Sequence, residues 1–248
     1  MSRFYQFDVH MHTAETSKCG RIPAADLVDR YKAAGYDGII ITDHLHEEYI
    51  SLLYCYDDWD TCVDRFLDGY KRAKKRGDEV GVQVFLAAEL RFAENDNDYL
   101  VYGIDEAWLR AHPYPFRMGP VEFFRRFQHD LLIVQAHPFR DGNRFIRWDC
   151  IHGLEVVNTH PDHENLNEAS LEAFRHQSHL YPLCGSDTHR KGQECASWVL
   201  LEQPVRNIQD YIAAVRQGAY TLGCKNETDQ KILEEVARLR NKESAPTC

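Results

Sequence analysis

Short apolar segments alternate along the chain with longer segments that have the amphipathic spacing of helices. The apolar segments, which predict β-strands, are residues 4–9, 39–42, 82–87, 99–102, 131–136, 154–157, 182–184 and 198–201. The helical spacing covers residues 22–35, 59–76, 120–128, 165–178, 207–217 and 227–241. Continuous apolar runs such as residues 39–42 are typical of strands buried on both faces, as in parallel sheets.

This alternation predicts an α/β fold in which one domain spans residues 1–248. Strands that alternate with helices form a parallel sheet or a barrel. We expect the barrel core over about residues 4–224 and a C-terminal helix over about residues 227–241. The chain has no internal repeat, low-complexity segment or linker that would divide it.

The composition excludes several classes of protein. Of the 248 residues, 44% are hydrophobic, enough to bury a core, which excludes a disordered chain. Asp and Glu number 39 against 29 Lys and Arg, and this formal charge of −10 argues against general nucleic-acid binding. No apolar run approaches the ~20 residues of a membrane span, and the first residues lack the apolar core of a signal peptide. We therefore expect a soluble, cytoplasmic protein.

The eight cysteines have neither CxxC spacing nor the dense short spacings of a disulfide scaffold. We predict that most of them are reduced thiols in the core.

Ionisable side chains gather where the predicted strands end. Five strand ends carry Asp8, His10 and His12; Asp43 and His44; Glu89; His137; and Asp187 and His189. In a β/α barrel these ends share one rim, where active sites are built. His10 and His12 alternate, so both imidazoles emerge on the same face of an extended segment. Mixed imidazole and carboxylate ligands suit Zn, Mn or Fe, and because the set exceeds what one ion needs, we expect two or three divalent metal ions.

In this order, the motifs resemble those of the PHP (polymerase and histidinol phosphatase) superfamily. They are HxH (His10, His12), TDH (Asp43, His44), the strand-end Glu89, AHP (His137) and SDTH (Asp187, His189). The match spans residues 8–189, and the residues around the motifs are similar to those of stand-alone bacterial members. The resemblance implies a distorted (β/α)7, TIM-like barrel of the PHP type with a di- or trinuclear metal site at the strand ends. It also implies hydrolysis of phosphate esters by a metal-bound hydroxide.

The resemblance further implies a ligand set. The first metal would take His10, His12, Glu89 and Asp187, the second Glu89 and His137, and the third His44 and His189. Of these residues, Glu89, Asp187 and His189 would act directly in catalysis. Asp8 and Asp43, each close to a ligand histidine, would orient imidazoles from behind.

Two positions depart from the family pattern. Where members place a histidine ligand of the second metal, this chain has Asp98, which can still bind as a carboxylate. Where the third metal usually finds a His or Asp, residues 17–18 are Ser and Lys. Glu15 or Cys19 could reach that metal instead. We favour Glu15, and leave open a Cys19 thiolate, which would favour zinc, or an empty third site.

Three arginines close to the candidate ligands fit a phosphate group, whose oxygens match the planar fork of guanidinium: Arg140, Arg91 and Arg21. The insertion at residues 45–60 and the polar loop at residues 158–167 would form a lid or the walls of a pocket on the same rim. We therefore predict a metal-dependent hydrolase that acts on a small phosphate monoester, similar to histidinol phosphate or a nucleotide.

Two alternatives remain open. One is a different hydrolysis at the same metal site, by a phosphodiesterase, an exonuclease or an amidohydrolase; the other is a non-catalytic metal-binding role. The acidic composition disfavours a nucleic-acid partner, and we expect no membrane partner. The sequence leaves the substrate, the native metal and the oligomeric state open.

Overall fold

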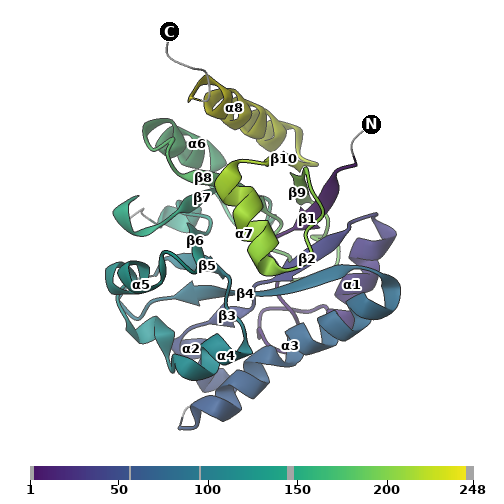
Figure 1. The fold of residues 1–248 in the computed structure, drawn as a ribbon, viewed down its shortest axis with the longest axis vertical. Coiled ribbons are helices and arrows are strands. Elements are labelled where there is room, and N and C mark those ends of the chain that lie inside the picture. The colour runs from purple at the N-terminus through teal and green to yellow at the C-terminus, as the bar shows by residue number, and fades with distance from the viewer. Residues whose placement is uncertain (1–2, 56, 95, 144–147, 244–248) are drawn as a thin grey trace.

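The computed structural model describes residues 3–55, 57–94, 96–143 and 148–243. In this part of the chain, ten strands form one curved sheet with helices around it (Figure 1). The strands are β1 (Tyr5–Asp8), β2 (Gly38–Ile41), β3 (His44–Leu45), β4 (Gln83–Arg91), β5 (Asp98–Tyr102), β6 (Leu132–Gln135), β7 (Gly153–Asn158), β8 (Tyr181–Gly185), β9 (Ser197–Leu201) and β10 (Tyr220–Cys224). The helices are α1 (Ala24–Ala33), α2 (Glu47–Leu52), α3 (Trp59–Val80), α4 (Glu106–Ala111), α5 (Pro120–Phe127), α6 (Asn167–His176), α7 (Ile208–Gln217) and α8 (Glu227–Glu243).

Seven of the described strands close into a barrel. The sheet order is β10-β9-β1-β2-β4-β5-β6-β7-β8, and the chain meets itself just beyond the ends of β1 and β8. There the Asp187 amide donates to the His10 carbonyl at 2.9 Å, and the His12 amide donates to the Thr188 carbonyl at 3.0 Å. The predicted distorted (β/α)7 barrel is therefore confirmed, with β9 and β10 added beside β1.

The alternation of strands and helices predicts a parallel sheet or barrel, but part of the sheet is antiparallel. Strand β5 is antiparallel to β4 and β6, and β9 is antiparallel to β1 and β10. Residues 92–97, which join β4 to β5, are too few for the crossover that a parallel neighbour requires, so the chain turns back as a hairpin. The pattern also misses β10, whose sequence YTLGC has a short apolar run interrupted by glycine.

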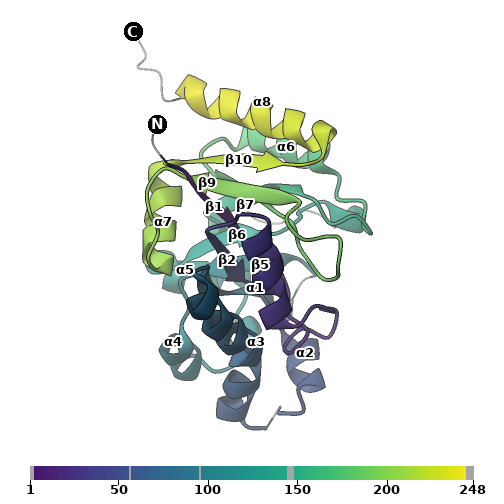
Figure 2. The same cartoon turned by 90° about the vertical axis from the view of Figure 1, so that its right-hand side faces the viewer.

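Helices cover the barrel in packed pairs. Helix α1 packs on α3, and α6 packs on α8 on the other side of the molecule (Figure 2). Helix α3 begins where the Asp58 side chain accepts from the Thr61 amide, and it ends at Gly81, whose φ of 74° is left-handed. It therefore runs beyond residue 76, where the sequence pattern predicted its end.

The barrel interior is apolar, and α7 closes its amino-terminal end. Phe85, Leu100 and Val134 belong to a buried cluster that also contains three side chains of α7. The Arg216 guanidinium of α7 donates to carbonyls just before β6, including that of Leu131 at 3.0 Å. The strand ends that carry the candidate ligands therefore lie at the opposite end of the barrel.

One pair of cysteines departs from the prediction of reduced thiols. Cys55, which follows α2, and Cys62, in the first turn of α3, form a disulfide with their Cα atoms 5.1 Å apart. Cys19, Cys184, Cys195 and Cys224 are free thiols. Within the described residues, every helix is too short or too polar to cross a bilayer.

Candidate metal centre

The strand ends bring the predicted ligands into one buried cluster. Its side chains are His10, His12, Glu89, His137 and Asp187, each 4% exposed or less, with His44 and His189 at the edge. The Nε2 atom of His12 lies 3.2 Å from both Glu89 Oε2 and Asp187 Oδ1. The Nε2 atom of His10 lies 3.5 and 3.4 Å from the same two carboxylates. The barrel thus places two imidazoles and two carboxylates around one point.

Glu89 lies between several imidazoles. Its Oε1 is 2.9 Å from His137 Nε2, and its Oε2 is 2.9 Å from His44 Nδ1. Burial raises the pKa of this carboxyl, but the charges of His44 and His10 and the bonds to the imidazoles outweigh that effect and hold the pKa well below its usual range. Glu89 is therefore an ionised carboxylate whose two oxygens face different sides of the cluster.

Hydrogen bonds fix the tautomers of two imidazoles. His10 Nδ1 lies 2.9 Å from Glu155 Oε1, and His189 Nδ1 lies 2.8 Å from the Asp187 carbonyl oxygen. Both oxygens accept hydrogen bonds, so in each neutral ring Nδ1 carries the hydrogen and Nε2 keeps a lone pair. This is the tautomer that binds metal through Nε2.

His12 is held in the same way by a serine. Its Nδ1 lies 3.4 Å from Ser17 Oγ, whose own hydrogen goes to Asp43 Oδ1 at 2.7 Å. Asp43 also accepts from the amide and hydroxyl of Thr13 at 2.8 and 2.7 Å. Asp43, which we predicted to orient an imidazole, thus contacts His12 through Ser17.

The nitrogen and oxygen atoms that face the centre of the cluster are better partners for a metal ion than for one another. His10 Nε2, His12 Nε2, His44 Nδ1, Glu89 Oε2 and Asp187 Oδ1 are buried and have no hydrogen-bond partner among the described residues. Their separations fall within ion-pair distance: burial lowers the pKa of His12, but Asp187 and Glu89 outweigh this effect and raise it to about 9, so the cluster attracts positive charge. A buried polar atom without a partner costs about 1–3 kcal/mol. Cations bound among them would satisfy these atoms, and three sets of ligand atoms here lie within 4.8 Å of one another: His10, His137 and Asp187; His10, His12 and Glu89; and His44, Glu89 and Asp98.

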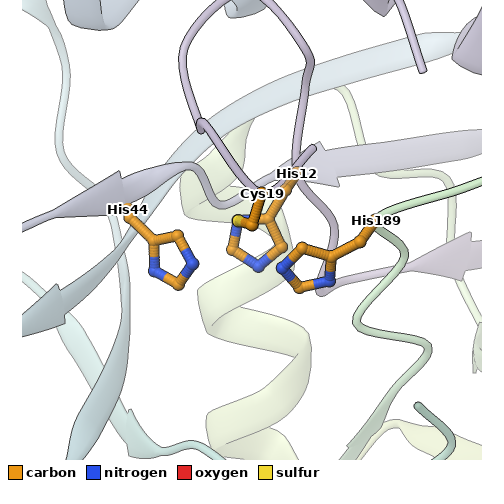
Figure 3. A group of neighbouring side chains, drawn as sticks. All are labelled: His12, Cys19, His44 and His189. Atoms are coloured by element: carbon orange, nitrogen blue, oxygen red, sulfur yellow. The ribbon is translucent and has the colours of Figure 1, made fainter. Parts of the chain in front are cut away.

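A fourth such set contains sulfur. Its members are His12, Cys19, His44 and His189, whose ligand atoms also lie within 4.8 Å of one another. Figure 3 shows the three imidazoles, which come from separate segments of the chain, gathered around the Cys19 side chain. Burial raises the pKa of the free Cys19 thiol to about 12.

Glu155 is a member of the site that the sequence analysis missed. It lies in β7, fully buried, and accepts from His10 Nδ1 at 2.9 Å, from the His137 amide at 2.8 Å and from Asn158 Nδ2 at 3.0 Å. Burial raises its pKa, but the His10 charge and hydrogen bond outweigh this and leave the pKa below its usual value. An acidic residue inside an otherwise apolar strand (GLEVVN) was the available indication.

Asp8, predicted to orient an imidazole, contacts the backbone of His10 instead of its ring. It accepts from the His10 amide at 3.4 Å, the Ser186 amide at 3.3 Å and the Tyr31 hydroxyl at 2.6 Å. Burial raises the pKa of Asp8 to about 6. Asp8 therefore ties β1 to α1 and to the end of β8.

Arg140 and Arg91 lie at the site, each bound to a carboxylate. Arg140 is buried and donates through Nη2 to Asp187 Oδ2 at 2.6 Å and to Asn158 Oδ1 at 2.7 Å. Arg91 donates to both oxygens of Asp98 at 2.8 Å. Asp98 therefore faces a guanidinium, with its Oδ2 3.9 Å from His137 Nε2.

Glu15 and Arg21 lie outside the cluster. Both oxygens of Glu15 accept from the Ala24 amide, at 3.2 and 3.0 Å, so the carboxylate stabilises the first turn of α1. The Arg21 side chain is exposed and does not line the cavity above the cluster. Only its amide approaches the site, where it donates to the His189 carbonyl at 2.6 Å.

A polar cavity of about 470 Å³ opens above the cluster. Besides the ligands, its lining includes Cys19, Arg91, Asp96, Asp98, Arg140, Asp141, Asn143, His160, His163 and Arg190. His160, which the sequence analysis did not single out, has its ring 5.0 Å from that of His189. Its Nδ1 accepts from the Asp162 amide at 3.2 Å, and burial lowers its pKa to about 4, so the neutral ring carries its hydrogen on Nε2.

The comparisons with known proteins agree with this geometry. Residues 8–239 match the model of the PHP domain family. A two-domain protein from Bacteroides vulgatus ATCC 8482, described as containing a predicted PHP-like metal-dependent phosphoesterase, has a similar structure: TM-score 0.65 and 15% identity, covering 94% of this chain and 70% of that one. PsfC from Pseudomonas syringae PB-5123 has a TM-score of 0.62 and 16% identity, covering 97% and 99%.

A third similar structure is a putative metal-dependent phosphoesterase from Bifidobacterium adolescentis ATCC 15703, with a TM-score of 0.50 and 15% identity, covering 85% of this chain and 96% of that one. No curated protein matches the sequence. The family model spans nearly the whole chain, including every strand end that carries a candidate ligand. The chain therefore belongs to the PHP domain family.

Proposed function

We propose that this protein is a metal-dependent phosphoesterase that hydrolyses a small phosphate monoester. The observation that carries the proposal is the convergence of buried, unpartnered ligand atoms beneath a cavity that also presents arginine. The ligand atoms fit divalent cations, and the guanidinium groups fit the oxygens of a phosphate.

The proposed metal ligands follow the tautomers and distances. His10, His12, Glu89 and Asp187 would hold one ion, and Glu89 and His137 would hold a second. Divalent ions bound there would activate water and offset the negative charge of a phosphoryl group. Glu155 and Ser17 keep Nδ1 of His10 and of His12 protonated, so that both Nε2 lone pairs stay available. His44 and His189 lie on the side of the cluster next to His12, where a third ion would bind.

Arg140 is the residue best placed to hold the phosphate. It is anchored by Asp187, Asn158 and Asn165 and lines the cavity directly above the ligands. These anchors use the Nε hydrogen and both Nη2 hydrogens, so the two hydrogens of Nη1 remain to donate to phosphate oxygens. Arg91 lies on the same wall, held by both oxygens of Asp98, and its remaining N–H groups offer a second contact to the phosphate.

His160 would position the substrate, and His189 would act as a ligand. The neutral His160 ring offers an Nε2 hydrogen next to the cavity, suited to a phosphate oxygen or the leaving oxygen. His189 has its hydrogen on Nδ1, facing a carbonyl, and burial lowers its pKa to about 3. It is therefore an acceptor toward the site and a poor source of the proton that the leaving group needs.

The size and charge of the cavity favour a small substrate. About 470 Å³ accommodates a metabolite-sized monoester. Asp96, Asp98 and Asp141 in the wall disfavour the long run of phosphates in a nucleic-acid strand.

The test is release of inorganic phosphate from a panel of metabolite monoesters by protein loaded with Zn, Mn or Fe. Glu89→Gln and His137→Ala should reduce turnover to background while circular dichroism shows an unchanged fold. His176→Ala, at an exposed histidine of α6, is the matched control and should retain activity. Release of an amine or of ammonia in place of phosphate, or full activity of both site variants, would refute the proposal.

A further inference from the structure

Cys19 lies where the cluster meets the cavity. It is in the loop between β1 and α1, seven residues beyond His12, and lines the cavity. Its sulfur belongs to the set formed with His12, His44 and His189. The carboxylate that we favoured from the sequence, Glu15, is occupied at the start of α1. Cys19 is thus the side chain of this loop whose metal-binding atom lies among the imidazoles of His12, His44 and His189 (Figure 3).

The loop that carries Cys19 is held in place on both sides. Before it, the Ser17 amide donates to the Thr13 carbonyl at 3.0 Å, and the Ser17 hydroxyl is bound to Asp43. After it, the Gly20 amide donates to the Ser17 carbonyl at 2.9 Å. A Cβ atom on Gly20 would lie 2.6 Å from the Thr13 carbonyl oxygen, so this tight turn requires glycine. The position of the sulfur therefore follows from a constrained backbone.

The neighbouring atoms are suited to a metal ion. His12 Nε2 is completely buried and His44 Nδ1 nearly so, and neither has a hydrogen-bond partner among the described residues. His189 turns its Nε2 lone pair away from the carbonyl that holds Nδ1. A single lone pair binds one metal ion. Because His12 Nε2 already faces Glu89 and Asp187, we assign His12 to the first ion and leave His44 and His189 for the ion at Cys19.

We infer that Cys19 is a thiolate ligand, with His44 and His189, of a metal ion at the edge of the cluster, and that this position selects zinc. Sulfur with two imidazoles is a ligand set that zinc accepts and that manganese and magnesium disfavour. The neighbouring positions, with carboxylates and imidazoles, lack sulfur and discriminate less. The inference deepens the proposed function, because it rests on a metal centre at the same rim.

Cobalt reports sulfur ligation directly. We would strip the full-length protein with a chelator and titrate it with Co²⁺ while recording the near-ultraviolet sulfur-to-cobalt charge-transfer band. The wild-type protein should develop this band, and Cys19→Ser should lack it. Cys224→Ser is the matched control, because that buried cysteine of β10 contacts the Asn226 carbonyl, away from the cluster, and should leave the band intact.

Zinc binding and a rescue variant complete the test. Cys19→Ser should bind about one zinc fewer at a fixed free concentration, because losing a ligand weakens affinity by more than the ~10–100-fold lost with an outer partner. Cys19→Asp should bind metal there again, with the preference shifted from zinc toward manganese, because a carboxylate oxygen suits the harder ion. A cobalt spectrum and zinc stoichiometry that are identical in wild type and Cys19→Ser would overturn the inference.

Phosphate release is measured separately on the same proteins. A charge-transfer band without hydrolysis of any monoester would refute the proposed function and leave the thiolate site standing. Hydrolysis without a band would refute the thiolate site alone.

Discussion

Replacing Glu155 by glutamine should change the hydrogen-bond polarity behind the metal ligands while keeping their shape. The carboxylate accepts from three donors: His10 Nδ1, the His137 amide and Asn158 Nδ2. Glutamine can accept on one side only, because its other side is an NH₂ group.

The amide has two orientations, and their costs differ. With NH₂ toward His137 and Asn158, two donors face a donor, and each buried group left without a partner costs about 1–3 kcal/mol. With NH₂ toward His10, one donor is affected, and the imidazole can respond by moving its hydrogen from Nδ1 to Nε2. The second orientation therefore costs less free energy than the first. We therefore expect Glu155→Gln to leave the His10 lone pair on Nδ1, facing the glutamine. The hydrogen would then be on Nε2, where the metal should bind.

The consequence should be measurable in metal affinity. Outer partners of metal-bound histidines contribute about 10–100-fold to affinity, which is about 1.4–2.8 kcal/mol. Competition with a chromophoric chelator would measure the change in zinc or manganese affinity. Nitrogen NMR of labelled histidine in the metal-free protein, at a pH high enough for the ring to be neutral, would show the tautomer of His10 directly. Glu172→Gln, at an exposed position of α6, is the control.

The reasoning fails if Glu155→Gln binds metal as tightly as the wild-type protein and His10 keeps its hydrogen on Nδ1. A loss of affinity with an unchanged tautomer would also contradict it, because the effect would then come from the lost charge alone.

Three further predictions concern substrate binding, acid stability and the Cys19 loop. Arg140→Lys should raise the KM for a phosphate monoester by about tenfold or more, with metal content unchanged by elemental analysis, because lysine has three N–H groups and the contacts to Asp187, Asn158 and Asn165 would use all of them; an unchanged KM would contradict the assigned role. Burial and the nearby charge of Arg216 lower the pKa of His152 to about 4, and its Nδ1 accepts from the Ile133 amide, so its contribution to stability is complete above pH 6.5 and is lost as the pH falls toward 4. His152→Asn, which keeps an acceptor but cannot titrate, should flatten the urea-unfolding free energy between these pH values, removing up to about 3 kcal/mol of variation; an unchanged slope would exclude His152 as the cause. Gly20→Ala should lower the unfolding free energy by about 1–3 kcal/mol, because its Cβ would meet the Thr13 carbonyl oxygen at 2.6 Å; a variant as stable as wild type would show that the loop can relax.

The strands, the principal helices and the rim of the barrel could be predicted because their hydrophobic period is strong and local. The direction of β5 depends on the length of the connection at residues 92–97, which periodicity does not report. Glu155 was missed because a single acid in an apolar strand gives no motif, although its burial beside His10 makes it part of the site. Cys55 and Cys62 lie seven residues apart, a spacing that becomes meaningful only once α2 and α3 are placed.

The choice between Glu15 and Cys19 shows why ligand spacing alone is insufficient. Both lie a few residues beyond His12 in one loop, and both have chemistry that binds metal. The loop turns at Gly20 so that the thiol faces the imidazoles and the carboxylate faces the Ala24 amide. Direction is a property of the folded backbone, which a count of residues cannot supply.

The arginines divide the carboxylates of the rim in a way that supports the proposed ligand set. Arg91 binds both oxygens of Asp98, which neutralises that carboxylate, whereas Arg140 binds one oxygen of Asp187 and leaves Oδ1 free for the cluster. Glu89 has no arginine partner among the described residues. The negative charge that the protein leaves uncompensated is therefore concentrated on Glu89 and on one oxygen of Asp187, where cations would bind. Asp98 is then a weaker ligand than its place in the sequence suggests, and its first role is to hold Arg91 at the cavity wall.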